Sequence, residues 1–239
     1  MSVIADALAP TGALRVAVWT VPYFTVERSG VLVGLIPDLG TELARRIGVP
    51  VELIGCATPG ALIEAFRGGA IDVTFVGITA DRAEAIDFGP VVLDIQTSYL
   101  VPAASPIMAI PDIDRAGVRI LVPARSAQEA HLKKTIAHAT LMPVAPENAS
   151  AAIAMLASGA AEAFSHVAPM LAAAQADLPG SRILPGSYFN VPIAIGIAKG
   201  RPAAARDYAR RFADDVKGSG FAQQAIVRAG VAGIVRAGT

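Results

Sequence analysis

The sequence has few of the residues from which catalytic and metal centres are commonly built. Its 239 residues include one cysteine, Cys56, and three histidines, His131, His138 and His166. A single cysteine excludes an internal disulfide, and no histidine has a partner at a recognised metal-ligand spacing. The motifs G-x-S-x-G, G-x-x-x-x-G-K-[ST] and G-x-G-x-x-G are also missing. We therefore expect no metal, no cofactor and no catalytic residue, with Cys56 buried, His131 and His138 on the surface and His166 packed inside.

Long hydrophobic runs and net charge are absent as well. Hydrophobic residues make up 54% of the chain, yet none of the apolar runs reaches the roughly 18 residues that a membrane helix needs. Twenty basic and twenty acidic residues give a net charge of zero, and the two signs alternate along the chain. This pattern lacks the basic footprint of a nucleic-acid binder. We expect a soluble monomer that neither inserts into a membrane nor binds nucleic acid.

The first twelve residues, M-S-V-I-A-D-A-L-A-P-T-G, do not have the pattern of a secretory signal. A basic segment is missing, and Asp6 interrupts the apolar stretch that a signal peptide requires. The expected location is the cytoplasm for the chain as written, or the periplasm if a leader was removed.

Apolar residues alternate between strand and helix spacing along the whole chain, which predicts an α/β fold with mostly parallel sheets. The predicted strands are 14–18, 31–33, 51–54, 71–76, 118–122, 141–144, 162–166, 183–184 and 193–198, and the predicted helices are 37–47, 61–66, 127–137, 148–158, 169–176, 202–216 and 221–229.

Two short segments, 100–105 and 190–193, each place a proline between extended stretches. If both connect the same two lobes, the first lobe is discontinuous and consists of residues 1–101 plus 192–239. The second lobe, residues 102–191, is then an insertion, and each lobe has an ordinary domain size.

Aromatic side chains follow the first predicted strand, although the whole chain has only one tryptophan and four tyrosines. Ligands of open parallel sheets bind beyond the carboxyl ends of the strands. Trp19 and Tyr23 could therefore form an aromatic wall for a ligand. The alternative is ordinary packing between the lobes.

A second candidate group follows the strand that ends at Val76. Gly77 offers a backbone amide, Thr79 a hydroxyl and Arg82 a guanidinium, and together these groups could hold a carboxylate. The alternative is a local ion pair between Arg82 and one of the carboxylates close to it in sequence, namely Asp81, Glu84 and Asp87.

In the second lobe, the candidates follow the strand 118–122 and end the strand 162–166. Ser126 and Glu129 have the spacing of a capping box at a helix start, and Arg125 adds a cation there, so an anionic ligand is a testable hypothesis. A purely structural cap is the alternative for Ser126. His166 is a candidate ligand contact or a packed structural histidine.

Several segments resemble one known family in their order and spacing. These are G-A-L-R-V-A-V, G-L-I-P-D-L-G-T-E-L-A-R-R-I-G-V-P-V-E, I-D-V-T-F-V-G-I-T-A-D-R-A-E-A-I-D-F, G-V-R-I-L-V-P-A-R-S-A-Q-E, L-A-S-G-A-A-E-A and A-I-G-I-A-K-G-R-P. Nearly the whole chain resembles the type II solute-binding proteins of ABC importers, in the amino-acid cluster called bacterial extracellular solute-binding protein family 3. It is also similar to a subgroup that begins with L-A-P-T-G and carries no leader.

The resemblance implies a two-lobe periplasmic-binding-protein-like type II fold that closes around a small ligand by hinge bending. In the amino-acid binders, residues matching Thr79 and Arg82 hold the ligand's carboxylate, and an aromatic after the first strand packs on the ligand. Their usual turn before that arginine is about two residues longer, and their Gly-Ser or Gly-Thr pair is replaced here by Arg125 and Ser126. Their aspartate for the α-amino group has no counterpart near His166.

The function implied is that of a solute-binding protein in an ABC-type uptake system. Its expected partners are a small anionic or zwitterionic ligand, amino-acid-like or an organic acid, and an ABC permease. One alternative is an enzyme resembling the cyclohexadienyl dehydratases of this fold, for which the ionisable candidates would be Arg82, Arg125, His166 and Glu27. A cytoplasmic ligand-sensing module is the other.

Overall fold

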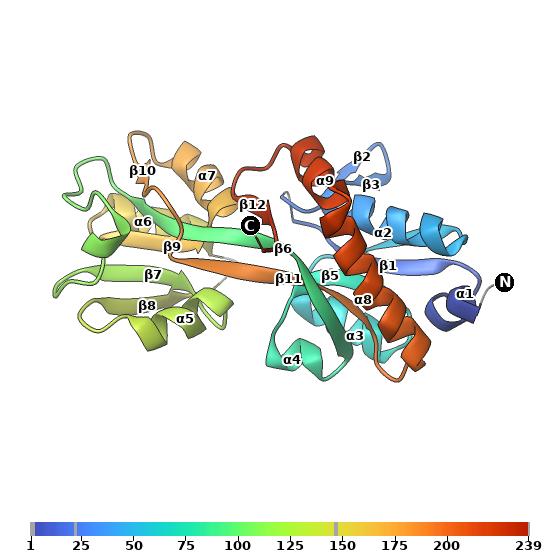
Figure 1. Ribbon diagram of the computed structural model, residues 1–239. Helices are drawn as coiled ribbons and strands as arrows, with labels where there is room; N and C mark the ends of the chain where they lie inside the picture. The colour runs from blue at the N-terminus through green and yellow to red at the C-terminus, as the bar shows by residue number, and fades with distance from the viewer. Residues whose placement is uncertain (1–2, 22, 146–147, 239) are drawn as a thin grey trace. The chain divides into compact units, whose positions relative to one another are not determined.

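In the computed structural model, which describes residues 3–21, 23–145 and 148–238, the chain divides into two compact units. Unit 1 comprises residues 1–94, 192–231 and 235–239, and unit 2 comprises residues 95–191 and 232–234. Each unit is an α/β structure with its own sheet and flanking helices (Figure 1), as the sequence predicted. The function of the units as two separately moving lobes stays a prediction.

Unit 1 contains a sheet in the order β4-β1-β5-β11, in which β4, β1 and β5 are parallel and β11 is antiparallel to β5. The next two strands after β1 in the chain, β2 and β3, form a separate antiparallel two-stranded sheet. The strands are β1 (Leu14–Trp19), β2 (Val26–Arg28), β3 (Val31–Val33), β4 (Val51–Cys56), β5 (Val73–Gly77) and β11 (Phe189–Ala198), and the helices are α1 (Val3–Leu8), α2 (Leu35–Ile47), α3 (Pro59–Arg67), α4 (Ala80–Ala83), α8 (Ala203–Gly218) and α9 (Phe221–Ala229).

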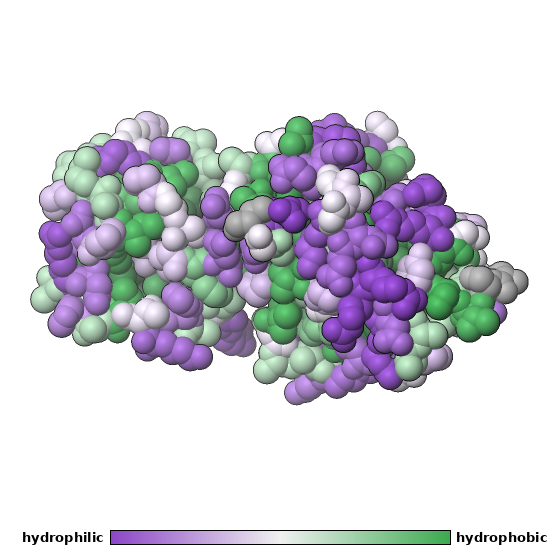
Figure 2. All heavy atoms as spheres, in the orientation of Figure 1, coloured by the Kyte–Doolittle hydropathy of each residue, from purple (hydrophilic) through white to green (hydrophobic). Residues whose placement is uncertain are grey.

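Helices cover both faces of the unit 1 sheet because successive strand residues point to opposite faces. On one face, Val16 meets α2, and the ring of Phe75 lies 6.2 Å from that of Phe212 on α8. On the other face, Ala17 and Val76 pack in one cluster with α3. The outward side of α8 is hydrophilic (Figure 2), whereas the residues buried at helical spacing are Ala205, Ala209, Phe212, Ala213 and Val216.

Unit 2 contains a sheet in the order β6-β9-β7-β8, with β7 parallel to both β8 and β9, and β6 antiparallel to β9. Its elements are β6 (Ile86–Val101), β7 (Arg119–Pro123), β8 (Thr140–Val144), β9 (Ala163–Val167), β10 (Arg182–Ile183), β12 (Ile234–Arg236), α5 (Ala127–Thr135), α6 (Ala149–Ala157), α7 (Ala168–Asp177) and the 3-10 turn η1 (Ile110–Asp112). The strands β6, β11 and β12 include residues of both units.

The core of unit 2 has two halves, one on each face of its sheet. Ile120 and Val122 of β7 pack with Leu132 of α5, while Leu121 between them packs with α6 and α7. This alternation along one strand is the pattern of a sheet buried on both faces.

The structure corrects several details of the predicted elements. The largest is β6, whose 16 residues include the stretch around residue 100 that we interpreted as a connection between lobes. Gly89, Pro90 and the polar residues Asp94, Gln96, Thr97 and Ser98 hide the strand from a search for apolar alternation. Helix α1 was also missed, although Ala5, Ala7 and Leu8 are buried. Helix α5 ends at Thr135, two residues before the predicted end.

Candidate ligand-binding site

Strand ends in unit 1 bring the first group of predicted residues together. The register of β1 with β5 pairs Ala17 with Thr74, so Trp19 lies level with the end of β5, directly before Gly77. Helix α4 follows at once, with Thr79 as its N-cap and Arg82 in its last turn. The residues expected to hold a ligand therefore lie at one edge of this sheet, where parallel strands present their carboxyl ends.

Arg82 is the most buried cation of this group, with only 9% of its surface exposed. Its Nη1 donates a hydrogen bond of 2.7 Å to the carbonyl oxygen of Gly77, and its guanidinium carbon lies 5.7 Å from the centre of the Trp19 ring. Burial lowers the pKa of Arg82, while the nearby Tyr23 and Asp81 act in the opposite direction. One fixed donor bond and an aromatic face thus hold the guanidinium in place.

The local ion pair that we considered for Arg82 does not form within the described residues. Glu84, one of the three carboxylates considered, binds Arg67 at 2.9 Å instead. In the described chain, Arg82 makes no ion pair with Asp81 or Asp87 either. A buried cation without a carboxylate is costly, so an anionic ligand at this place would stabilise it.

Aromatic and hydroxyl groups surround this guanidinium. Tyr23 is half-buried, and burial raises the pKa of its hydroxyl to about 12 against the opposing charge of Arg82. The Tyr23 ring packs on Phe24, with 4.8 Å between the ring centres, and Phe24 itself belongs to the core. The Thr79 hydroxyl oxygen accepts the backbone N–H of Arg82 at 3.4 Å, which leaves its O–H proton available as a donor.

In unit 2, the predicted residues gather at the carboxyl ends of β7 and β9. The register pairs Leu121 with Phe164, which places His166 level with Pro123, just before Arg125 and Ser126. Ser126 caps α5: its oxygen accepts the N–H of Glu129 at 3.0 Å and its O–H donates to the carbonyl of Pro123 at 2.6 Å.

The N-terminus of α5 carries its own anion in this protein. Glu129 is 7% exposed, and its Oε2 accepts the backbone N–H of Arg125 at 2.5 Å while its Oε1 pairs with Lys133 at 2.7 Å. Lys133 is the main cause of the lowered pKa of Glu129. Arg125 adopts a left-handed backbone with φ of 56°, and its side chain is exposed. The Glu129 carboxylate thus occupies the position at the start of α5 where we expected an anionic ligand.

His166 is partly buried and carries no charge at neutral pH, because burial lowers its pKa to about 4. Its Nδ1 accepts the N–H of Val167 at 2.8 Å, so Nε2 bears the proton of the neutral ring. The ring stands edge-on to Phe164 at 5.5 Å. His166 is therefore a neutral hydrogen-bond donor and cannot replace a carboxylate as the partner of an ammonium group.

Comparison with known proteins assigns the family. The model of the bacterial extracellular solute-binding proteins, family 3, matches residues 14–229. The chain belongs to this family. A search of curated proteins found no match.

Solved structures agree with this assignment at the level of the fold. An ancestral arginine-binding protein bound to arginine is 25% identical, with a TM-score of 0.66 over 91% of this chain and 97% of that one. An amino acid ABC transporter substrate-binding protein from Streptococcus pneumoniae bound to L-arginine is 20% identical, with a TM-score of 0.68 over 94% and 97%. An ancestral amino acid-binding protein described as a precursor of cyclohexadienyl dehydratase is 23% identical, with a TM-score of 0.68 over 93% and 97%.

The sequence search missed one polar group of this family 3 solute-binding protein. In unit 2, the hydroxyls of Ser165 and Tyr188 are 2.6 Å apart, and Tyr188 stacks on Tyr99 with 4.7 Å between the ring centres. His131 stacks on Phe189 at 4.5 Å and is half-buried, so our prediction of a surface residue was wrong. The rarity of tyrosine in this chain was the signal that could have drawn attention to Tyr188.

Two further findings concern the described part of the chain. None of its helices is long and apolar enough to cross a membrane. Its His, Cys, Asp and Glu side chains form no group of three or more that could hold a metal ion.

Proposed function

We propose that this family 3 solute-binding protein binds a small carboxylate-bearing solute, amino-acid-like or an organic acid, through Arg82. The observation that carries the proposal is a buried guanidinium fixed by the Gly77 carbonyl and the Trp19 ring, without an ion pair among the described residues. Arg82 would bind the carboxylate, the Thr79 hydroxyl would donate a further hydrogen bond, and Trp19 and Tyr23 would pack on the ligand body. Arg125, Ser126 and His166 are proposed as the contacts from unit 2.

The similar proteins support a small amino-acid-like ligand with a carboxylate group, because two of those named above are bound to arginine. For this chain we propose that an α-amino group is not required. Near the carboxyl ends of β7 and β9, His166 is neutral and Glu129 is already bound to Lys133 and to the Arg125 amide. A ligand in which a hydroxyl or keto oxygen replaces the ammonium group would suit the Nε2 donor of His166 better.

Substitution of Arg82 tests this proposal directly. Native mass spectrometry of gently purified protein would first identify a co-purified ligand, and calorimetry would then compare wild type with Arg82→Gln. We expect the affinity to fall at least about a hundredfold, since loss of one partner of a buried charge pair costs about 3 kcal/mol. The matched control is Arg228→Gln, because Arg228 of α9 is half-exposed and pairs with Asp38. Equal affinity in Arg82→Gln and wild type would contradict the proposal.

The ligand class has a separate test. Calorimetric titration with arginine, lysine and glutamine, and with the 2-oxo and 2-hydroxy acids of the same side chains, separates the two forms of the proposal. Tighter binding of the oxo or hydroxy acid is the expected result. Preference for the amino acid would contradict the argument from His166 while leaving the role of Arg82 intact.

We further propose that the protein delivers its ligand to an ABC permease and performs no chemistry on it. A dehydratase needs a general acid or base in its site. His166, with a pKa near 4, holds no proton to donate from an imidazolium at neutral pH, and Arg82 and Arg125 are permanent cations. The fourth candidate, Glu27, is exposed on β2. Turnover of prephenate or arogenate by the purified protein would contradict the binding-only role.

A further inference from the structure

A pocket lies in unit 1, and none of its lining residues belongs to the Arg82 group. It has a volume of about 510 Å³ and is lined by the end of α3, the turn before β5, the residues after α4 and the residues after β11. The N–H of Ala198 donates a hydrogen bond to the carbonyl oxygen of Asp72, just before β5 begins. The guanidinium of Arg82 donates to the carbonyl oxygen of Gly77, where β5 ends. The side of the pocket near Ala198 and the Arg82 group are thus separated by the length of β5, about 13 Å at the usual rise per strand residue. The opposite side is formed by Glu84 and Ala85, which follow Arg82 closely in the chain.

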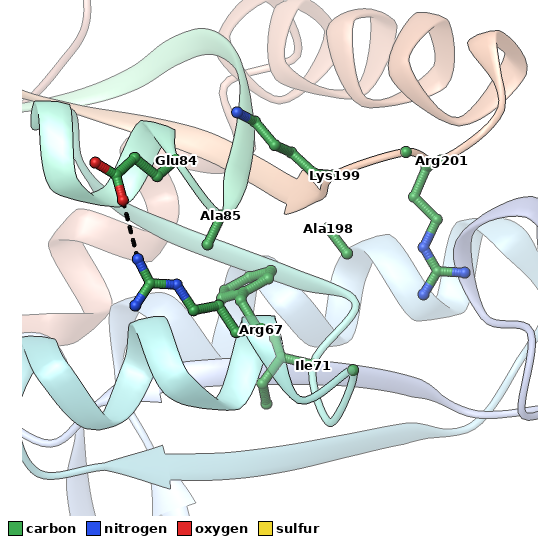
Figure 3. A pocket seen from close by; sticks show the side chains of 10 residues that line it. Arg67, Ile71, Glu84, Ala85, Ala198, Lys199 and Arg201 are labelled. Atoms are coloured by element: carbon green, nitrogen blue, oxygen red, sulfur yellow. Dashed lines mark hydrogen bonds and ion pairs between the residues drawn. The ribbon is translucent and has the colours of Figure 1, made fainter.

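Cations dominate the wall of this pocket. Figure 3 shows Arg67 and Glu84 on one side and Arg201 on the other, with Lys199 above and Ile71 below. Arg67 forms ion pairs of 2.9 Å with both Glu84 and Glu64, so the side of Arg67 and Glu84 carries no excess of positive charge. An excess of positive charge is present only on the side of Lys199 and Arg201, which we call the unbalanced side.

The unbalanced side is built around a fully buried carboxylate. Asp72 is 0% exposed and accepts hydrogen bonds from the backbone N–H and guanidinium of Arg15 as well as from Arg201. Two guanidinium groups thus share one carboxylate, and the exposed Lys199 makes no ion pair with any described residue. Arg201 is held in place by Asp72, with its side chain still 18% exposed toward solvent.

We propose that this pocket is a second ligand site, which takes a compact oxyanion such as the carboxylate or phosphate group of a small metabolite. Arg201, fixed by Asp72, and the exposed ammonium of Lys199 supply the charge-assisted hydrogen bonds. Neither residue belongs to the Arg82 group. The anion would balance the positive charge that Asp72 alone leaves uncompensated.

An NMR titration tests the second site. Amide spectra of the full chain are recorded with increasing inorganic phosphate and, separately, succinate, with sodium chloride at equal ionic strength as the reference. We expect saturable shifts of the amides of Gly69, Ile71, Ala198 and Gly200 with at least one of the two anions. They should persist in Arg82→Gln. Absence of saturable shifts with both anions, or shifts confined to residues 77–82, would overturn the proposal.

Lys199→Gln is the decisive variant because it leaves the contacts of Asp72 in place. The affinity for the anion should fall about tenfold, because one charge-assisted hydrogen bond is lost. The control is Lys134→Gln, since Lys134 is an exposed lysine on α5 in unit 2. Equal affinities in these two variants would also overturn the proposal. Arg201→Gln, used once its fold is verified by circular dichroism, should weaken the anion at least as much.

Discussion

At the scale of single residues, Glu42 shows how charge pairing depends on helix geometry. It lies on α2 with 9% of its surface exposed, and its two carboxylate oxygens accept hydrogen bonds from Arg45 at 2.7 and 2.9 Å and from Arg46 at 2.7 Å. Residues three and four apart on a helix share a face, so this sequence spacing already predicts the contact. The Arg45 hydrogen bonds, aided by Arg46, lower the pKa of Glu42 to about 2.

This lowered pKa predicts a pH-dependent contribution to stability. A carboxyl whose pKa is lower in the folded state stabilises the fold above its unfolded value, near 4.5, and loses that effect as the pH falls toward 2. Glu42→Gln should therefore lower the free energy of unfolding by about 2 kcal/mol at pH 7. Urea unfolding of wild type and Glu42→Gln at pH 7 and at pH 3 to 4 measures the difference in their free energies of unfolding at each pH. A difference between the two proteins that stays constant over this range would contradict the assignment.

Arg82 shows what residue-level reasoning from sequence leaves open. Its position after a strand made it a candidate ligand contact, yet three carboxylates close in sequence offered an equally local explanation. In the structure, Glu84 does not pair with Arg82 because it binds Arg67, which lies 17 residues earlier in the chain. A competition between partners so far apart in sequence depends on how α3 and α4 pack, which local spacing does not encode.

At the scale of elements, α2 shows why a glycine can sit inside a helix. A Cβ built on Gly40 would lie 2.8 and 3.1 Å from the two γ-carbons of Val16. The absence of a side chain at Gly40 therefore lets α2 approach β1 closely. The sequence predicted this helix correctly from its apolar spacing, but it gave no reason for the glycine.

Gly40→Ala should consequently destabilise the protein although alanine favours a helix. The overlap with the stiff Val16 side chain costs more than the propensity gain of about 1 kcal/mol, and we expect a net loss of about 1 to 2 kcal/mol. Thermal and urea unfolding measure this loss. Gly218→Ala is the control, because nothing lies within 4 Å of a Cβ built at the end of α8. Equal or greater stability of Gly40→Ala would show that α2 can shift without cost.

Element prediction failed where polar residues interrupt a long strand. We predicted no strand between residues 76 and 118, but β6 covers 16 residues of this stretch and carries the chain from unit 1 into unit 2. Thr97 and Ser98 are buried there because their hydroxyls donate to the carbonyls of Phe189 and Leu184. Such distant partners satisfy polar residues inside a sheet, and they leave no periodic signal in the sequence.

At the scale of the whole molecule, the chain passes between its two units several times. Residues 94–95 and 191–192 are the main crossings, within β6 and β11, and residues 232–234 join unit 2 from the C-terminal region. A solute-binding protein built in this way can bend at a few strand positions while each unit keeps its own core.

We predict that the ligand at Arg82 closes the molecule. At saturation, the radius of gyration in small-angle X-ray scattering should decrease and the melting temperature should rise, since a ligand that contacts both units favours the closed state. Arg82→Gln at the same ligand concentration should show neither change. An increase in melting temperature without compaction would place the whole ligand on unit 1.

The sequence by itself determined the alternation of strands and helices, the family and the residues that follow the strands. Each helix or strand must bury one face, so its apolar residues recur in the sequence at the spacing of that element. Only the tertiary structure decided three pairings. Among the described residues, no carboxylate pairs with Arg82, whose guanidinium binds the Gly77 carbonyl. The Glu129 carboxylate accepts the Arg125 N–H at the start of α5, and Asp72 pairs with both Arg15 and Arg201. These pairings compete through space, and their outcome depends on packing between segments that are distant in the chain.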